Sequence, residues 1–142
     1  MEQEDTIDYN IRKTWQNITK LYNRTANEYM ASMGLGMVLL NIDMTEGTPS
    51  TQLGPNMGME ATSLSRYLIK LEEHKVIERR ADPNDKRKSI IHLTALGINR
   101  REVAKKVVIE FNENVKSHFE EKEMEIFFSI LKKINKIIDN TK

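Results

Sequence analysis

The chain has 142 residues, 30% of them charged, and a formal net charge of +1, which suits one well-solvated domain and argues against a disordered polycation. Glycine (6) and proline (3) are scarce, which favours a mostly helical chain over a sandwich or barrel of many short strands. The absence of cysteine excludes a disulfide scaffold, a thiolate zinc site, a cysteine nucleophile and a thiol redox switch.

The first two predicted elements are helices. Between about Asp8 and Met30, apolar residues recur at spacings of three and four and form one helical stripe: Ile11, Trp15, Ile18, Tyr22, Ala26 and Tyr29. A break at Gly34–Gly36 is expected to open a second helix over residues 35–44, which Glu46-Gly47 would end.

Two further helices are predicted next. Thr48 as a cap and Pro49 at the first helical position indicate a third helix near residues 49–57. The pair Gly54-Pro55 should make this helix short, irregular or kinked, because proline removes a helical hydrogen bond. A fourth helix is predicted from about Glu60 to His74.

The pattern then changes to that of strands. Two β-prone runs, residues 76–80 and 89–93, flank the turn-forming tetrad Asp82-Pro83-Asn84-Asp85 and predict a two-stranded hairpin. Residues 79–88 hold five basic and two acidic side chains, so the tip of this hairpin is expected to be basic.

Two long helices complete the chain. Thr94 is expected to cap a fifth helix from about Ala95 to His118. The acidic run Glu120–Glu123 is expected to open a sixth, because acidic side chains suit a helix N-terminus.

The order of these elements predicts the architecture. Three compact helices followed by a hairpin form a winged helix-turn-helix, here residues 35–97, within one mainly α (α+β) domain of residues 1–142. The flanking segments 1–34 and 98–142 carry more apolar surface than a monomer needs, and a symmetric dimer is the simplest partner. The residues expected at the dimer interface are Ile11, Trp15, Phe127, Leu131 and Ile134.

The fourth predicted helix has two different faces. At about 100° per residue, its leucines fall within a narrow arc and should face the core: Leu64, Leu68 and Leu71. The outer and flanking residues are mostly small, hydroxylated or basic: Thr62, Ser63, Ser65, Arg66, Ile69, Lys70 and Glu73. Such a face suits a helix that enters the major groove of DNA. An ordinary amphipathic helix with a solvated face has the same pattern.

The predicted hairpin adds cations beside this helix. Lys86, Arg87 and Lys88 follow the turn. Long cations on a thin hairpin can follow the phosphate backbone or enter the minor groove, where the negative potential is strongest. The alternative is a mobile charged hairpin without a partner, which leaves the pairing of a hydroxyl-rich helix with a basic wing unexplained.

These segments resemble the MarR (multiple antibiotic resistance regulator) family. The resemblance is carried by residues 64–72 (Leu-Ser-Arg-Tyr-Leu-Ile-Lys-Leu-Glu), residues 76–79 (Val-Ile-Glu-Arg), residues 82–88 (Asp-Pro-Asn-Asp-Lys-Arg-Lys) and residues 92–97 (His-Leu-Thr-Ala-Leu-Gly). The Asp-Pro-x-Asp-x-Arg wing followed by Leu-Thr-x-x-Gly is the most specific part.

The resemblance implies a homodimeric winged-helix transcription factor, usually a repressor, that binds pseudo-palindromic operators in double-stranded DNA. It implies that the first, fifth and sixth helices form the dimer interface and that residues 60–73 form the recognition helix. It further implies that Arg87 reaches the minor groove and that Asp85 orients the arginines of the wing. The usual contact positions of the recognition helix fall on Thr62, Ser63, Ser65 and Arg66.

Many members of this family are released from DNA by small aromatic or phenolic ligands bound between the dimer helices and the winged domain. Six of the eight methionines lie in the segment that would line such a crevice: Met30, Met33, Met37, Met44, Met57 and Met59. Methionine adapts to irregular shapes, so a plastic effector pocket is one interpretation and ordinary core filling is the other. No individual residue is assigned to a ligand.

Nothing in the sequence indicates catalysis, a cofactor or a metal site. There is no nucleophile elbow or phosphate-binding loop, and the three histidines lack metal-site spacing. The longest uncharged stretch, residues 29–42, is too short to span a bilayer, and the N-terminus is acidic, so we expect a cytoplasmic protein.

The preferred function is a dimeric, ligand-responsive DNA-binding repressor that is not an enzyme. The alternative is a winged-helix protein-interaction module without DNA binding.

Overall fold

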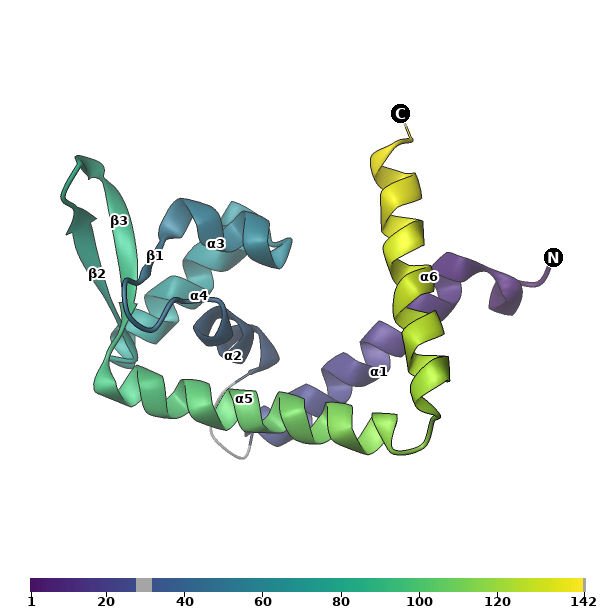
Figure 1. Cartoon of the computed structure of the whole chain (residues 1–142). Coiled ribbons are helices and arrows are strands. Elements are labelled where there is room, and N and C mark those ends of the chain that lie inside the picture. The colour runs from purple at the N-terminus through teal and green to yellow at the C-terminus, as the bar shows by residue number, and fades with distance from the viewer. Residues whose placement is uncertain (28–31, 142) are drawn as a thin grey trace. The chain divides into compact units, whose positions relative to one another are not determined.

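Helices dominate the chain, as the scarcity of glycine and proline predicts (Figure 1). The computed structural model describes residues 1–27 and 32–141. These residues form two compact units, Met1–Val107 and Val108–Lys142, and the boundary between them falls inside one helix. Each unit is therefore described by itself.

The first unit begins with a short 3₁₀ turn, η1 (Gln3–Asp5), that leads into helix α1 (Ile7–Asn27). The predicted first helix is confirmed over these residues, and its predicted end, with Tyr29 and Met30, lies outside the described residues. Helix α2 (Met33–Leu40) follows. The Asn23 side chain of α1 holds its start, because Asn23 Oδ1 accepts the Met33 N–H at 2.9 Å.

Helix α2 differs from its prediction at both ends. Gly34 and Gly36 were expected to break the chain, yet both lie inside the helix. At the other end, Asp43 Oδ1 accepts the backbone N–H groups of Glu46 at 2.8 Å and Thr45 at 2.9 Å. These bonds hold the pKa of Asp43 below its ordinary value and form a turn where the helix was expected to continue.

Helices α3 (Ser50–Met57) and α4 (Ala61–Glu73) form the helix-turn-helix. The expected shortness of the third helix is confirmed, but the helix runs through Pro55 without interruption. Pro55 lies in the last turn, where its missing N–H removes a single helical hydrogen bond. The prediction that Thr48 caps this helix is wrong, because Pro49 holds the N-cap position.

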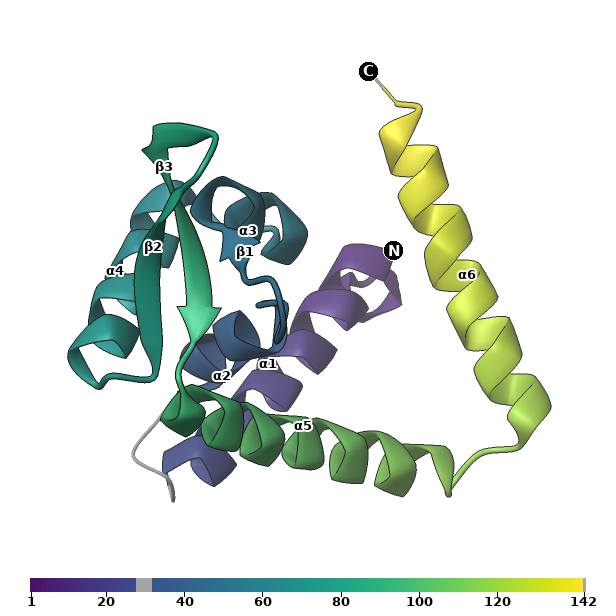
Figure 2. The same cartoon turned by 60° about the vertical axis from the view of Figure 1, so that its left-hand side comes forward.

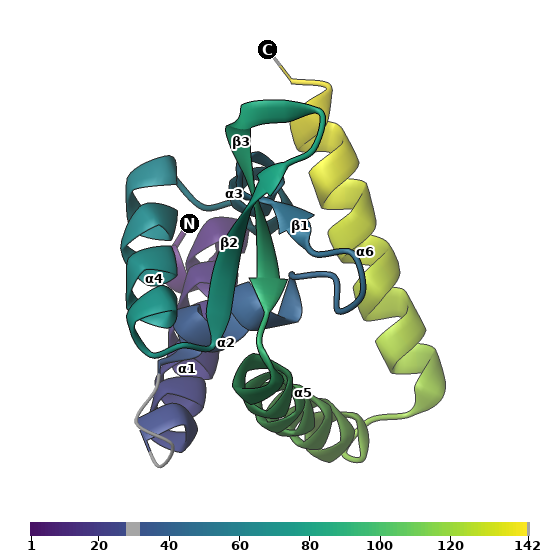
Figure 3. The ribbon, with the colours of Figure 1, turned by 90° about the vertical axis from the view of Figure 1, so that its left-hand side faces the viewer.

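Thr48 instead belongs to a strand that the sequence did not reveal. Strand β1 (Thr48–Pro49) pairs with β3 (Asp85–Leu93), which also pairs with β2 (Ile77–Asp82), so the order is β1-β3-β2 (Figure 3). All pairs are antiparallel, and the hairpin register joins Ile77 to Leu93. A two-residue strand is too short to show alternation, so only its partner strand defines it.

One hydrophobic core joins these elements. Its residues come from α2, α3, α4, the sheet and the segments that join them, which explains why the three helices and the hairpin form a winged helix-turn-helix. The buried apolar residues are Leu35, Val38, Leu39, Ile42, Leu53, Leu64, Leu68, Leu71, Val76, Ile77 and Ile91.

Helix α5 (Ala95–Lys116) begins at a tight junction with the wing. Thr94 caps it as predicted, because its Oγ1 accepts the Gly97 N–H at 3.0 Å. The same hydroxyl donates to the carbonyl oxygen of Lys75 at 2.7 Å, and the Thr94 N–H donates to Val76 O at 3.1 Å. Gly97 is needed here because any Cβ would collide with the Val76 carbonyl oxygen.

Gly97→Ala should therefore destabilise the first unit strongly. The overlap involves backbone atoms, which cannot move aside as a flexible side chain would. We expect a loss of about 1–3 kcal/mol in the free energy of unfolding, measured by urea denaturation followed by circular dichroism. Gly36→Ala is the matched control, since its Cβ would meet only Ala104 Cβ at 3.5 Å, an ordinary contact. Equal stability of the two variants would contradict the proposed collision.

The second unit contains the end of α5 and helix α6 (Glu121–Asp139). Glu120 and Glu123 form a capping box at the start of α6, in which Glu123 Oε1 accepts the Glu120 N–H at 3.0 Å. No residue of α6, all of which is described, is buried, although the helix has a continuous apolar face. Within this unit, the Lys116 ammonium lies 5.7 Å from the centre of the Phe128 ring.

Candidate nucleic-acid interface

Helix α4 presents the two faces that the sequence predicts. Its three leucines are buried in the core. The residues of the opposite face and its flanks are all exposed: Thr62, Ser63, Ser65, Arg66, Ile69, Lys70 and Glu73. Core packing therefore anchors one side of the helix and leaves the hydroxylated, basic side open to a partner. Figure 2 shows α4 at the left-hand edge of the view, behind β2.

The turn between α3 and α4 sets the direction in which α4 leaves α3. Gly58 adopts the left-handed conformation at φ +63° and ends α3. The Met59 N–H then donates to the Gly54 carbonyl oxygen at 2.9 Å, and the Gly58 N–H donates to Pro55 O at 3.3 Å. Met57 and Met59, on either side of this glycine, pack against the core. These contacts fix the N-terminal half of α4, where the exposed hydroxyl groups lie.

A packing contact between α4 and α2 was missed by the sequence analysis. A Cβ at Gly34 would overlap the ring of Tyr67, so this ring lies directly over the glycine. Tyr67 is half-buried and packs against the core. The only sequence signal was the glycine itself, which was interpreted as a helix break because nothing local indicates which side chain covers it.

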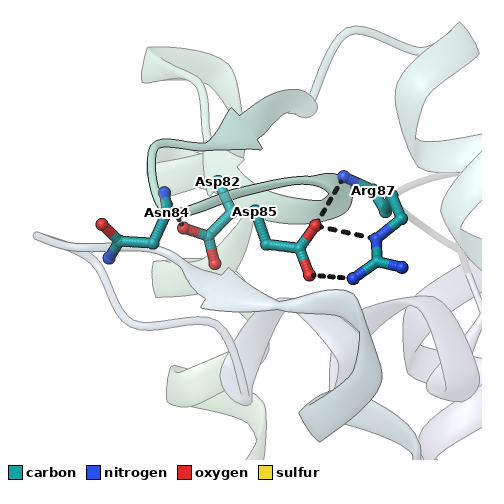
Figure 4. A network of polar contacts seen from close by, with 4 residues as sticks. All are labelled: Asp82, Asn84, Asp85 and Arg87. Atoms are coloured by element: carbon teal, nitrogen blue, oxygen red, sulfur yellow. Dashed lines mark hydrogen bonds and ion pairs between the residues drawn. The ribbon is translucent and has the colours of Figure 1, made fainter.

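The wing is held at its tip by two acidic side chains (Figure 4). Asp82 Oδ1 accepts the Asn84 N–H at 2.8 Å and closes the turn. Asp85 Oδ1 accepts from both the Arg87 side-chain Nε at 3.2 Å and the Arg87 backbone N–H at 3.0 Å. The Arg87 guanidinium and then its backbone N–H hold the pKa of Asp85 below its ordinary value, so this carboxylate stays ionised at neutral pH.

Asp85 and Arg87 differ sharply in exposure. The Arg87 side chain is 91% exposed, whereas that of Asp85 is 28% exposed. The less exposed carboxylate thus binds the guanidinium, most of which still faces solvent. This is the arrangement expected of an acid that orients an arginine toward a partner.

The basic residues of the hairpin fall into two groups. Arg79 Nε lies 3.3 Å from Glu72 Oε2 of α4, and Arg80 Nε donates to Glu78 at 2.9 Å, so these arginines are already paired. Both arginines belong to the basic segment of residues 79–88, which has the pattern of one cluster in the sequence. Across the described part of the chain, four exposed cations of α4 and the wing have no ion-pair partner: Arg66, Lys70, Lys86 and Lys88. Within α4 and the hairpin, the unpaired positive charge therefore lies on the outer face of α4 and on β3 just past the wing turn.

The residues expected at a dimer interface are solvent-accessible within their own units. In the first unit, Ile11 and Trp15 are exposed on α1, Trp15 by 48%. In the second unit, Phe127 is 50% exposed, and Leu131 and Ile134 are half-buried on α6. Large aromatic and aliphatic side chains left open in this way commonly mark a protein partner surface.

The methionines expected to line an effector crevice differ in their surroundings. Met57 and Met59 pack against the core, Met44 is exposed, and Met30 lies outside the described residues. In residues 1–27 and 32–141, no group of three or more histidine, aspartate or glutamate side chains could hold a metal ion. None of the described helices combines the length and apolarity needed to cross a membrane.

Comparisons with known proteins agree with this geometry. Residues 32–89 match the model of the MarR family. Over 105 residues the chain is 30% identical to the HTH-type transcriptional regulator BilQ of Clostridium symbiosum (strain WAL-14163). The aligned region covers 74% of this chain and 73% of that protein.

Two solved structures share the fold. The S. aureus MepR–DNA complex superimposes with a TM-score of 0.86 and 22% identity, covering 92% of this chain and 97% of MepR. PcaV of Streptomyces coelicolor, crystallised with its natural ligand, gives a TM-score of 0.83 and 17% identity, covering 96% of each chain.

Proposed function

The chain belongs to the MarR family of transcriptional regulators, and from this premise we propose that it binds double-stranded operator DNA as a homodimer and represses transcription. The observation that carries the proposal is that one exposed face of α4 joins hydroxyl groups with the unpaired cations Arg66 and Lys70, and that the wing adds the exposed side chains of Lys86, Arg87 and Lys88. A core-anchored helix with this face suits the major groove, and an exposed, oriented arginine suits the neighbouring minor groove.

Each part of the site has a separate role in this proposal. Arg66 reads a base edge, and Thr62, Ser63 and Ser65 contact base edges or phosphates along the groove. Lys70, Lys86 and Lys88 neutralise phosphates, Asp85 orients the wing, and Arg87 enters the minor groove. The residues of the site are Thr62, Ser63, Ser65, Arg66, Lys70, Asp85, Lys86, Arg87 and Lys88.

A second copy of the chain supplies the second half of the interface. Residues 1–34 and 98–142 provide the dimerisation helices, and residues 35–97 provide the DNA-binding part. Two recognition helices about 34 Å apart would occupy successive major grooves on one side of the duplex and block a promoter there. The exposed apolar side chains of α1 and α6 support this assignment, because a monomer gains nothing from them.

Repression would end when a small aromatic ligand changes the spacing of the two recognition helices. The support for this part is the shared fold with PcaV, which was crystallised with a natural ligand. A ligand that binds only to dimers with the other helix spacing shifts the population toward that spacing. Fewer dimers then have the spacing that fits DNA, so the affinity for DNA falls.

A gel-shift assay tests the proposed function directly. The probe is the DNA upstream of the protein's own gene, with a random duplex of equal length as competitor. We expect a retarded complex that survives an excess of the random duplex. Binding to neither duplex would support the protein-interaction module instead and would overturn the proposal.

Arg87→Ala should weaken DNA binding and lower its salt dependence. A cation bound in the minor groove displaces a counterion from the DNA, so without it the slope of log affinity against log salt should fall by about one. The slope is measured by fluorescence anisotropy at several salt concentrations. Arg80→Ala is the matched control, because Arg80 is on the same hairpin but is paired with Glu78. If Arg87→Ala left the slope unchanged, the proposed contact between the wing and DNA would be contradicted.

A further inference from the structure

One exposed side chain on the outer face of α4 is neither polar nor charged. Ile69 is 49% exposed, and it is the only large apolar residue of α4 that is exposed; the structure describes this helix throughout. The core does not need it, because the leucines on the opposite side of the helix fill that role. Ile69 therefore leaves one apolar side chain open to a partner on this face.

The direction of the side chain places it within the DNA-facing surface. Side chains on an α-helix lean toward the helix N-terminus, so Ile69 covers the turn that carries Ser65 and Arg66. It also lies seven residues, about two turns, from Thr62, on the same line along the helix. Ile69 therefore lies beside the residues proposed to read DNA, near the C-terminal end of their surface.

Two cations beside Ile69 limit what can cover it. Arg66 and Lys70 have no ion-pair partner among the described residues, so a covering molecule must be compatible with two cations. One turn further along, Glu73 is exposed and would be repelled by phosphates, which marks the end of the surface that DNA can approach. An occupant that is anionic at its rim and apolar at one point fits this surface.

The major groove has one apolar group, the C5 methyl of thymine. We propose that Ile69 contacts a thymine methyl and so selects an A·T pair in each half-site. Ile69 lies three residues beyond Arg66, about 4.5 Å along the helix, which corresponds to one or two base pairs of the duplex. The selected thymine therefore lies within about two base pairs of the base contacted by Arg66. This inference rests on the proposed function, since it requires α4 to lie in the major groove.

Replacing thymine by deoxyuridine removes only the methyl group and gives a direct test. The wild-type protein first selects its preferred sequence from a pool of random duplexes. Each thymine of the selected half-site is then replaced singly by deoxyuridine, and affinities are measured by anisotropy. Burial of one methyl group corresponds to roughly a fourfold change in affinity, so one position per half-site should lose about that factor.

The protein variant then assigns this loss to Ile69. Ile69→Ala should bind the all-thymine duplex more weakly and should be insensitive to deoxyuridine at that one position, while other positions behave as in wild type. Leu96→Ala is the matched control, because Leu96 is 44% exposed but belongs to α5. It should leave the deoxyuridine sensitivity unchanged.

The outcomes separate the two proposals. If a sequence is selected but no thymine is sensitive, or Ile69→Ala keeps the sensitivity, the contact is overturned and DNA binding stands. If the pool yields no preferred sequence, the proposed function fails and the contact fails with it. Should Ile69→Ala not fold, the deoxyuridine series on the wild-type protein still decides whether a methyl group is read near the Arg66 base.

Discussion

Phe127→Lys should convert the protein into a monomer and lower its affinity for operator DNA by about 100-fold or more, because binding of the second half-site is no longer tethered to the first. Phe127 is 50% exposed within its own unit, so folding of the single chain does not depend on its burial. In the proposed dimer, however, a lysine at this position would place an unpaired charge in an apolar interface. The symmetry of the dimer introduces this charge twice.

Two measurements check this prediction. Sedimentation equilibrium gives the mass of the protein, and fluorescence anisotropy gives its affinity for DNA. Ser129→Lys introduces the same side chain on the same helix, but Ser129 is exposed on the opposite side of α6. This control should remain dimeric with wild-type affinity. A Phe127→Lys protein that keeps the mass of a dimer would show that the apolar face of α6 does not form the interface.

Arg66→Ala should remove sequence discrimination and leave much of the general affinity for DNA. Arg66 lies on the outer face of α4 without an ion-pair partner in the described part of the chain, and a guanidinium can donate two parallel hydrogen bonds to guanine. Loss of such a contact should cost about 1–3 kcal/mol on the preferred sequence. On a random duplex, where these base contacts are absent, the loss should be small.

Measurements on two duplexes distinguish a base contact from a phosphate contact. Affinities of wild type and variant are measured on the selected sequence and on a random duplex at one salt concentration. Lys70→Ala is the control, because a cation that contacts only phosphate contributes equally to both duplexes. If Arg66→Ala lost the same factor on both, Arg66 would also be a phosphate contact and would not read a base.

The parts of the fold that sequence could predict are those set by local periodicity. The leucine spacing of α4 decides which face is buried, and the structure confirms both faces. Thr94 and Gly97 form a capped, close-packed helix start, which gives the Leu-Thr-x-x-Gly motif a physical reason. The wing turn is likewise local, because Asp82 and Asp85 bond to backbone groups two residues away.

The parts that sequence could not predict depend on contacts between distant residues. Strand β1 exists only because β3 pairs with it, and Gly34 is required only because Tyr67 of another helix covers it. The basic hairpin appeared uniform in sequence, but Glu72 and Glu78 pair with two of its arginines. Which cations remain available to DNA is therefore a property of the fold.

Operator spacing tests the central claim most directly, namely that two recognition helices read one face of the duplex together. The affinity is measured on the selected inverted repeat and on a version with five base pairs inserted between its half-sites, about half a helical turn. We predict that the insertion lowers the affinity to that of a single half-site, because the second recognition helix then faces the wrong side of the DNA. Equal affinities for the two duplexes would contradict the claim.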